Sequence, residues 1–478
     1  MTVSTRMIPR GVVGFICGAL AAATLIYSGA LPSREATGPE AGEASEAIAK
    51  RPVEASPHIV LVVVCTLRRD QVSVYGGPAD LTPTLAEWAR EGAVFEHAYS
   101  AAPWTKAAST AIMTGHHAIQ VGMIEPESGA NRRRLSDEVT TLAEVFQGAG
   151  YFTLGLTANP NTNREFGFDQ GFDTYVQATD QWREGMVKVS GPRMAELALD
   201  ALDAREDQDT PVYLRMMILD PHAPLSVGMK EARRWKVDGE EVPARMLKYR
   251  HLVHRADRAI AVLEKGLEAR GMDRSNTVFM VVSDHGEGLR MPVHHGMGHG
   301  NLTFSTTVSM PWIAVGAGVA KGHRVGGAAS QVDVMPTLLG LAGLQAPDVQ
   351  GLDWSSQLIG KEQDTTRDVA FVDTWFQQAN RWAGYTAERS CHYDGRPDEA
   401  LPAQGRRLPQ TSCYDQRSDP YQESPLATLD EGLLEQMHGW REARMEEYRA
   451  FTSKEDVEVD VDLMEQLSAL GYVDEAAP

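Results

Sequence analysis

Two adjacent side chains with metal-binding chemistry, Asp284 and His285, follow a strongly apolar stretch of the sequence. Residues 277–283, TVFMVVS, have the composition of a strand that is buried on both faces. A carboxylate and an imidazole at the carboxyl end of such a strand stand where open α/β sheets bind their ligands. Together they offer a hard oxygen and a nitrogen to one divalent cation. A polar surface turn explains the pair equally well, so other parts of the chain must distinguish the two interpretations.

Two further segments are predicted to reach the same place. Residues 58–65 form a second buried-strand pattern, which ends in Cys65. A predicted helix begins at or near Thr105 and ends at residues 114–115, and the free N–H groups of a helix start favour an anion. We therefore expect two strand ends and one helix start to share a pocket suited to a cation.

The remaining pattern alternates helices with strands, which is typical of a parallel α/β sheet. Composition changes after about residue 365, where aromatic, glycine and arginine residues gather ahead of two charged helical stretches. We interpret residues 57–365 as an α/β domain and residues 366–478 as a smaller α+β subdomain. The predicted helices are 82–90, 142–150, 194–204, 247–269, 333–339, 430–450 and 462–470, and the other predicted strands are 94–98, 151–157, 211–219 and 312–315.

The first thirty-one residues predict export. Arg6 and Arg10 precede an apolar stretch, residues 11–31, whose length is close to the roughly 20 residues that cross a bilayer. The stretch is an uncleaved signal-anchor or a cleaved signal peptide, with a buried soluble helix as the remaining alternative. Residues 32–56 have the composition of a flexible linker. We expect the body of the protein to be extracytoplasmic, either periplasmic or at the cell surface, and held at the membrane if the anchor is kept.

Charge and cysteine content limit the partners and the compartment. The formal net charge of -20 argues against a nucleic-acid partner, because phosphate backbones are bound by basic surfaces. Cys391 and Cys413 flank a polar loop and would pair in an oxidising compartment. Closing that loop would stabilise the fold by about 3 kcal/mol in the chain-entropy model. Two free thiols are the alternative if the chain is not exported.

A series of short motifs matches one known family in order and in spacing. The chain resembles the sulfatase-like branch of the alkaline phosphatase superfamily over roughly residues 57–475. The resemblance implies a large mixed, mostly parallel sheet sandwiched by helices, with a smaller C-terminal sheet and helix. The matching motifs are Val63–Arg68, Thr82–Leu85, Ala102–Thr105, Gly167–Asp173, Asp220–Pro224, Ser283–Glu287, Gly298–Gly300, Tyr414–Pro420 and Leu467–Tyr472.

The resemblance also implies roles for particular residues. Asp284 and His285 match metal ligands, and Thr105 matches the nucleophile, which true sulfatases make by converting a Cys or Ser to formylglycine. His222 and His299 match positions that contact the transferred group or protonate the leaving oxygen. The implied cofactor is one divalent cation, with zinc, manganese and calcium as candidates, which would polarise the ester. The implied substrate is a sulfate or phosphate ester.

The chain departs from the family pattern at the site itself. Cys65 stands where the family has a metal-binding Asp; it is either a thiolate ligand, which favours zinc, or a small buried apolar residue. Residues 105–109, TKAAS, lack the Cys or Ser, the Pro and the Arg that formylglycine formation requires. Thr105 then either attacks directly or only caps its helix. Lys106 either replaces the lost positive charge or is a solvated residue at the helix start.

A further departure follows Gly300, where relatives carry tyrosine, acidic and arginine residues. Residues 304–311, FSTTVSMP, lack those charges and indicate a changed or relaxed pocket. His294 and His295 are either extra ligands or exposed loop histidines. Two functions remain: an exported, metal-dependent hydrolase or transferase of sulfate or phosphate esters, or a degraded family member that binds an anion or a partner without turnover.

Overall fold

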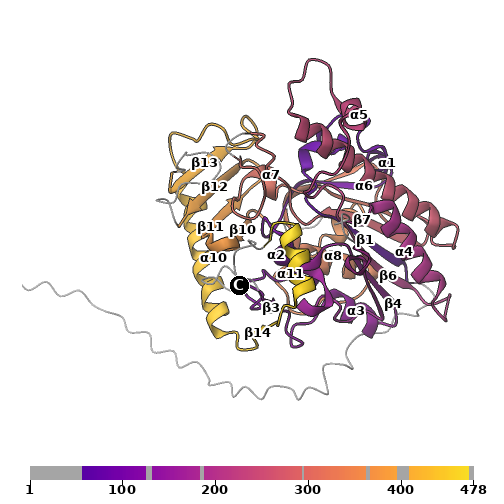
Figure 1. Ribbon diagram of the computed structural model, residues 1–478. Helices are drawn as coiled ribbons and strands as arrows, with labels where there is room; N and C mark the ends of the chain where they lie inside the picture. Colours follow the sequence, from indigo (N-terminus) through magenta and orange to yellow (C-terminus); the bar gives the residue numbers. More distant parts are fainter. Residues whose placement is uncertain are drawn as a thin grey trace, which may run out of the picture. The chain divides into compact units, whose positions relative to one another are not determined.

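An eight-stranded sheet with helices on both faces forms the body of the protein in the computed structural model (Figure 1). Strand β8 runs antiparallel to both of its neighbours, and the other pairings in this sheet are parallel. The sheet is therefore mixed and mostly parallel, as the sequence predicts. Its strands, in spatial order, are β5 (Thr174–Gln177), β4 (Phe152–Thr157), β6 (Val212–Ile218), β1 (His58–Val64), β7 (Thr277–Ser283), β8 (Trp312–Gly316), β2 (Ala93–Tyr99) and β9 (His323–Ser330).

Two layers of helices cover the sheet. Helices α1 and α4 both pack on α6 in one layer, and α2, α3 and α8 form the other (Figure 1). Apolar residues on both faces of the central strands make this burial favourable, and every residue of β7 is buried. The helices are α1 (Pro83–Glu91), α2 (Thr105–Thr114), α3 (Leu142–Gly148), α4 (Gly191–Asp203), α6 (Ala244–Glu268) and α8 (Val334–Ala342), with short turns at α5 (Met229–Ala232), α7 (Ser305–Val308) and α9 (Ser355–Leu358).

A second sheet carries the C-terminal subdomain. Its four strands are antiparallel, and helix α10 (Glu431–Ala450) packs on β11. Cys391 and Cys413 face each other on β12 and β13 and form the predicted disulfide. The strands are β10 (Ala370–Thr374), β11 (Arg381–Tyr385), β12 (Arg389–Asp394) and β13 (Thr411–Asp415).

The chain then returns to the large sheet's layers. Strand β14 (Glu455–Asp456) pairs with β3 (Arg133–Arg134), and helix α11 (Val461–Ala469) packs against the turn Pro160–Thr162 that follows β4. The buried side chains of Leu463 and Leu467 on α11, the short yellow helix at the centre of Figure 1, belong to the same apolar cluster as the strands of the large sheet. This return brings residues near 470 to the large sheet.

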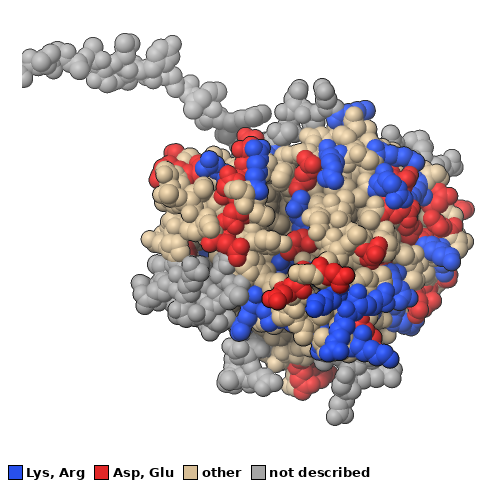
Figure 2. Space-filling model, turned by 90° about the horizontal axis from the view of Figure 1, so that it is seen from above, with Lys and Arg blue, Asp and Glu red and all other residues tan. Residues whose placement is uncertain are grey.

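The structure describes residues 56–124, 132–182, 188–292, 295–361, 367–395 and 409–472. The predicted N-terminal segment, residues 1–31, and nearly all of the linker lie outside these ranges. Within these ranges no helix has both the length and the apolar character needed to cross a membrane. On the face seen in Figure 2, acidic and basic side chains are interspersed. Ion pairs such as Arg270–Asp203 join oppositely charged side chains among the described residues.

Candidate active site

The ends of β1 and β7 bring Cys65 and Asp284 to the same edge of the sheet. The two strands are parallel neighbours with Val64 opposite Ser283, so the residue after each strand lies at the same level. The backbone N–H of Thr66 donates to Asp284 Oδ1 at 2.9 Å, which fixes the carboxylate against the neighbouring strand end. Thr66 has a φ of 58°, a value that is rare for a β-branched residue and that occurs mainly at functional sites.

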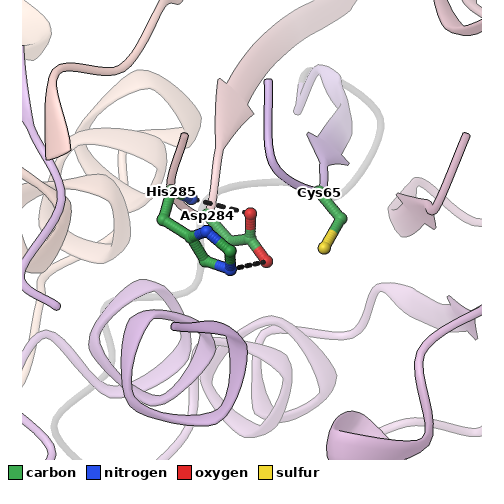
Figure 3. Close-up of side chains that lie close together, drawn as sticks. All are labelled: Cys65, Asp284 and His285. Atoms are coloured by element: carbon green, nitrogen blue, oxygen red, sulfur yellow. Dashed lines mark hydrogen bonds and ion pairs between the residues drawn. The ribbon is translucent and has the colours of Figure 1, made fainter. Parts of the chain in front are cut away.

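Cys65, Asp284 and His285 form a buried cluster of three potential metal donors (Figure 3). All three are fully buried, and their sulfur, oxygen and nitrogen donor atoms lie within 4.8 Å of one another. The interpretation of Asp284 and His285 as a polar surface turn is therefore wrong. Figure 3 shows the carboxylate between the imidazole ring and the thiol.

The hydrogen bonds of this cluster leave a position for a cation. His285 donates from Nδ1 to the Gly286 carbonyl at 2.8 Å, so the lone pair is on Nε2, which lies 3.5 Å from Asp284 Oδ2. That carboxylate oxygen is buried and accepts no hydrogen bond from any described residue. A buried carboxylate oxygen without a hydrogen bond is energetically costly, and a cation beside it would offset that cost. The donor set of sulfur, nitrogen and oxygen suits zinc better than calcium.

Burial controls the protonation of two of these donors. Burial and the charge of Asp284 raise the pKa of the Cys65 thiol well above its ordinary value. Burial lowers the pKa of His285 to about 4, so the ring is neutral at pH 7. The thiol is therefore neutral in the protein alone, and it would lose its proton only to a bound metal.

Thr105 is the first residue of α2 and lies directly over this cluster. Trp104, not Thr105, is the N-cap, and the Thr105 side chain makes no capping hydrogen bond, so the interpretation as a helix cap is wrong. Its Oγ1 lies 3.2 Å from His285 Nε2 and 3.6 Å from Cys65 Sγ. The distant segments therefore converge as expected, although the sequence could not show that the hydroxyl is fully buried.

His222 and His299 lie next to the cluster. His222 follows β6, the strand beside β1, and its ring centroid is 4.9 Å from that of His299. The His299 ring is 4.3 Å from His285 and is oriented by Glu287, whose Oε2 lies 3.2 Å from Nδ1. The two rings border a cavity of about 360 Å³ that is otherwise mostly apolar; its other lining residues include Leu225, Leu289, Met297, Phe376 and Tyr472.

Two minor expectations about polar residues are wrong. Lys106 is not solvated: it is fully buried, its Nζ lies 3.2 Å from the centre of the Phe166 ring, and it donates to the Arg133 carbonyl. His295 is not an exposed loop histidine, because it is 1% exposed and stacks on Phe304 with ring centres 4.5 Å apart. His295 is not one of the three converging donors, and His294 lies outside the described residues.

The unusual segment after Gly300 supports the loop that carries the candidate ligands. The backbone N–H groups of Gly286 and Glu287 donate to the carbonyls of Thr307 and Thr306 at 2.9 and 3.0 Å. A Cβ on Gly286 would lie 1.9 Å from the Thr306 carbonyl oxygen, so this close approach requires glycine. The segment is therefore packed against the site.

Two residues of the site had no role in the sequence analysis. Tyr472 OH lies 2.9 Å from Thr105 Oγ1 and 3.0 Å from His222 Nε2. Asn159, which follows β4, donates from Nδ2 to both Thr105 and Tyr472 at 3.3 and 3.0 Å. Tyr472 ends one of the matched motifs, and Asn159 follows a predicted strand, but neither signal specified a contact with Thr105.

Comparisons with known proteins agree with this architecture. A sequence model of the sulfatase family matches residues 57–344, more than half of the chain. The ulvan-active sulfatase of Formosa agariphila is 23% identical over 410 residues, which cover 77% of each chain. Human arylsulfatase A is 24% identical over 417 residues, which cover 70% of this chain and 78% of the relative.

Solved structures agree in fold. A protein in complex with its substrate D-glucosamine-2-N,6-O-disulfate superposes with a TM-score of 0.64 and 17% identity, covering 83% of this chain and 98% of that one. The phosphonate monoester hydrolase of Silicibacter pomeroyi gives a TM-score of 0.60 at 16% identity, covering 82% and 96%. The eight-stranded sheet and the match to the family model define this protein as a member of the alkaline phosphatase-like class. Within it, the chain belongs to the sulfatase family.

Proposed function

We propose that the protein hydrolyses sulfate esters, with Thr105 as the direct nucleophile. The observation that carries the proposal is the convergence of the Thr105 hydroxyl with the buried Cys65, Asp284 and His285 cluster, with 3.2 Å between Thr105 Oγ1 and His285 Nε2. The relatives named above act on sulfate esters according to their names, and residues 105–109 exclude the formylglycine route that true sulfatases use.

The residues around Thr105 suit the transfer of an anionic group. The N-terminus of α2 directs free backbone N–H groups toward the anion that Thr105 would attack. Asn159 donates a hydrogen bond to the same hydroxyl, and the imidazole of His299, oriented by Glu287, borders the cavity that would hold the alcohol part of the ester. Water would then attack the sulfur of the Thr105 ester and restore the hydroxyl.

Cys65, Asp284 and His285 would hold the divalent cation. When bound, this cation would polarise the ester oxygens and offset their negative charge. The buried, unpartnered Asp284 Oδ2 and the neutral His285 supply the donors that such an ion requires. Zinc fits the sulfur-containing set better than manganese or calcium.

Assays with a matched variant test this proposal. The purified protein, supplied with zinc, manganese or calcium in turn, is assayed on an aryl sulfate, an aryl phosphate and a phosphodiester. We expect the aryl sulfate to be turned over and the Thr105→Val variant, which keeps the shape of the side chain, to be inactive. If no sulfate or phosphate ester is hydrolysed with any of the three metals, the proposal is wrong. Phosphate turnover alone would instead identify a phosphoryl hydrolase or transferase.

Two observations favour a second candidate, a binding protein without turnover. The Thr105 hydroxyl is fully enclosed, and a neutral thiol replaces a carboxylate in the metal cluster. A smaller ligand charge weakens affinity for hard cations. Metal analysis separates the two candidates: stoichiometric metal that is lost in Asp284→Asn favours the hydrolase, and a metal-free protein favours the binding role.

We also propose that the protein works outside the cytoplasm. The Cys391–Cys413 disulfide supports this location, because such bonds persist in oxidising compartments. The apolar residues 11–31 would direct export, and they would tether the protein to the membrane if they are not cleaved. Fractionation of cells that express the full chain, with protease added from outside, tests both parts of this proposal.

A further inference from the structure

Tyr472 links the candidate nucleophile to a histidine on a different strand end. Its side chain is buried, and its hydroxyl lies 2.9 Å from Thr105 Oγ1 and 3.0 Å from His222 Nε2. Thr105 follows β2 and His222 follows β6, and no direct hydrogen bond between these two side chains occurs among the described residues. The phenol is therefore the bridge between them.

The direction of each hydrogen bond follows from the fixed partners. His222 Nδ1 lies 2.6 Å from the Ala223 carbonyl, which can only accept, so Nδ1 carries the proton and Nε2 carries the lone pair. Burial holds the pKa of His222 well below its ordinary value, so the ring is neutral. The Tyr472 hydroxyl must then donate its single proton to Nε2 of His222.

The remaining contacts make Thr105 the donor to Tyr472. Asn159 Oδ1 accepts from the backbone N–H of Asn161 at 3.0 Å, so Nδ2 faces the site and donates to Tyr472 OH at 3.0 Å. With its own proton directed at His222, the phenol oxygen can only accept from Thr105. That contact, at 2.9 Å, is shorter than the 3.2 Å from Thr105 Oγ1 to the competing acceptor, His285 Nε2. The hydrogen bonds therefore run in one direction, from Thr105 O–H through Tyr472 O–H to the imidazole.

We propose that Tyr472 is a catalytic residue that relays the Thr105 proton to His222 as Thr105 attacks. This inference rests on the proposed role of Thr105 as nucleophile. As the Thr105 Oγ–sulfur bond forms, the Thr105 proton moves to the Tyr472 oxygen, and the Tyr472 proton moves to His222 Nε2. The bond from sulfur to the alcohol oxygen breaks, its electron pair leaves with that oxygen, and the proton on His222 passes to the alkoxide. The products are a Thr105 sulfate ester and a neutral alcohol, so Tyr472 never has to exist as a phenolate, which its burial disfavours.

A sulfonyl fluoride isolates the first step from the rest of the reaction. Its leaving group is fluoride, which needs no proton from the protein, and its attachment to Thr105 is read by peptide mass spectrometry. We expect wild-type protein to be labelled at Thr105, and Tyr472→Phe, which keeps the ring, to be labelled about 100-fold more slowly, within the range of general-base effects. His222→Asn should be slowed to a similar extent, because it removes the base at the end of the relay.

Tyr393→Phe is the matched control. Its hydroxyl contacts Gln410 in the C-terminal sheet, outside the site, so its labelling rate should equal that of wild type. If Tyr472→Phe unfolds at the same temperature as wild type, its slower labelling cannot be due to lost folding. If Tyr472→Phe is unstable, the labelling rate of His222→Asn tests the relay in its place.

Three results decide the inference. If Tyr472→Phe is labelled as fast as wild type, or faster, the phenol covers Thr105 and does not relay its proton. Wild-type protein that is not labelled at Thr105 also overturns the relay. Labelling that depends on Tyr472 in a protein that hydrolyses none of the esters would keep the relay and overturn the proposed hydrolase function.

Discussion

Acid should destabilise this protein through His392, a histidine of β12 that is far from the candidate metal cluster in the sequence. The side chain is 7% exposed, and burial lowers its pKa to about 3. Gln422 donates to its Nε2 at 2.9 Å, so Nδ1 carries the proton and donates to Thr303 Oγ1 at 3.1 Å. A protonated ring would lose the bond from Gln422, because Nε2 could then no longer accept.

The size of the effect follows from the two pKa values. An unfolded histidine titrates near 6.5, so between about pH 6.5 and pH 3 the unfolded chain binds a proton that the folded chain excludes. Stability therefore falls as the pH falls through this window. From pH 7 to pH 5 the linkage relation gives a loss of about 2 kcal/mol from this residue alone. The loss is nearly the same whether the folded pKa is 3 or 4, because both values lie below pH 5.

Urea unfolding of wild type and His392→Gln at pH 7 and pH 5 measures this contribution. We expect wild type to lose about 2 kcal/mol more than the variant between the two pH values. Ser390→Ala is the control, because it removes another Gln422 contact without removing a titrating group, and it should keep the wild-type pH dependence. If His392→Gln loses as much stability as wild type, the imidazole is not excluded from protonation in the folded state and the reasoning fails.

Three other perturbations test the subdomain and the site. Replacing Cys391 and Cys413 by Ser opens a loop with a sequence separation of 22. The replacement should lower the free energy of unfolding in urea by about 3 kcal/mol under non-reducing conditions, and an unchanged unfolding midpoint would contradict this. Cys65→Asp adds a carboxylate to the candidate metal cluster and should shift preference from zinc toward calcium in titration calorimetry; an unaltered order of affinities would count against Cys65 as a ligand. Asp373→Asn leaves the buried Arg441 without its ion-pair partner and should lower the free energy of unfolding in urea by about 3 kcal/mol. A loss below about 1 kcal/mol would mean that this ion pair does not hold α10 on its sheet.

The sequence predicted the central strands and the convergence of the site because the signals there are local. Strands β1 and β7 are continuous apolar runs, and the polar residues that follow them lie at one edge of any parallel sheet that pairs them. Strand β9 was not predicted. Its sequence, HRVGGAAS, has two glycines and little apolar character, and it is held by pairing with β2 at the edge of the sheet.

The errors at the site come from contacts between distant parts of the chain. A lysine at a helix start is usually solvated, and only the folded chain brings the ring of Phe166 over Lys106. Likewise, Tyr472 follows the charged helix α11, and the local sequence pattern there does not indicate a role in a site. Its contact with Thr105 depends on the return of α11 to the turn after β4, which no short-range pattern encodes.

The 367 positions that separate Thr105 from Tyr472 also set an order of events during synthesis. At translation rates of about 5–20 residues per second, the ribosome needs roughly 20 to 70 seconds to extend a nascent chain from one to the other. The candidate nucleophile, the cluster of donors and both histidines would be made long before the phenol. On the proposed mechanism, a growing polypeptide would therefore be inactive until α11 packs on the large sheet, and a protease that removes α11 would inactivate the protein again.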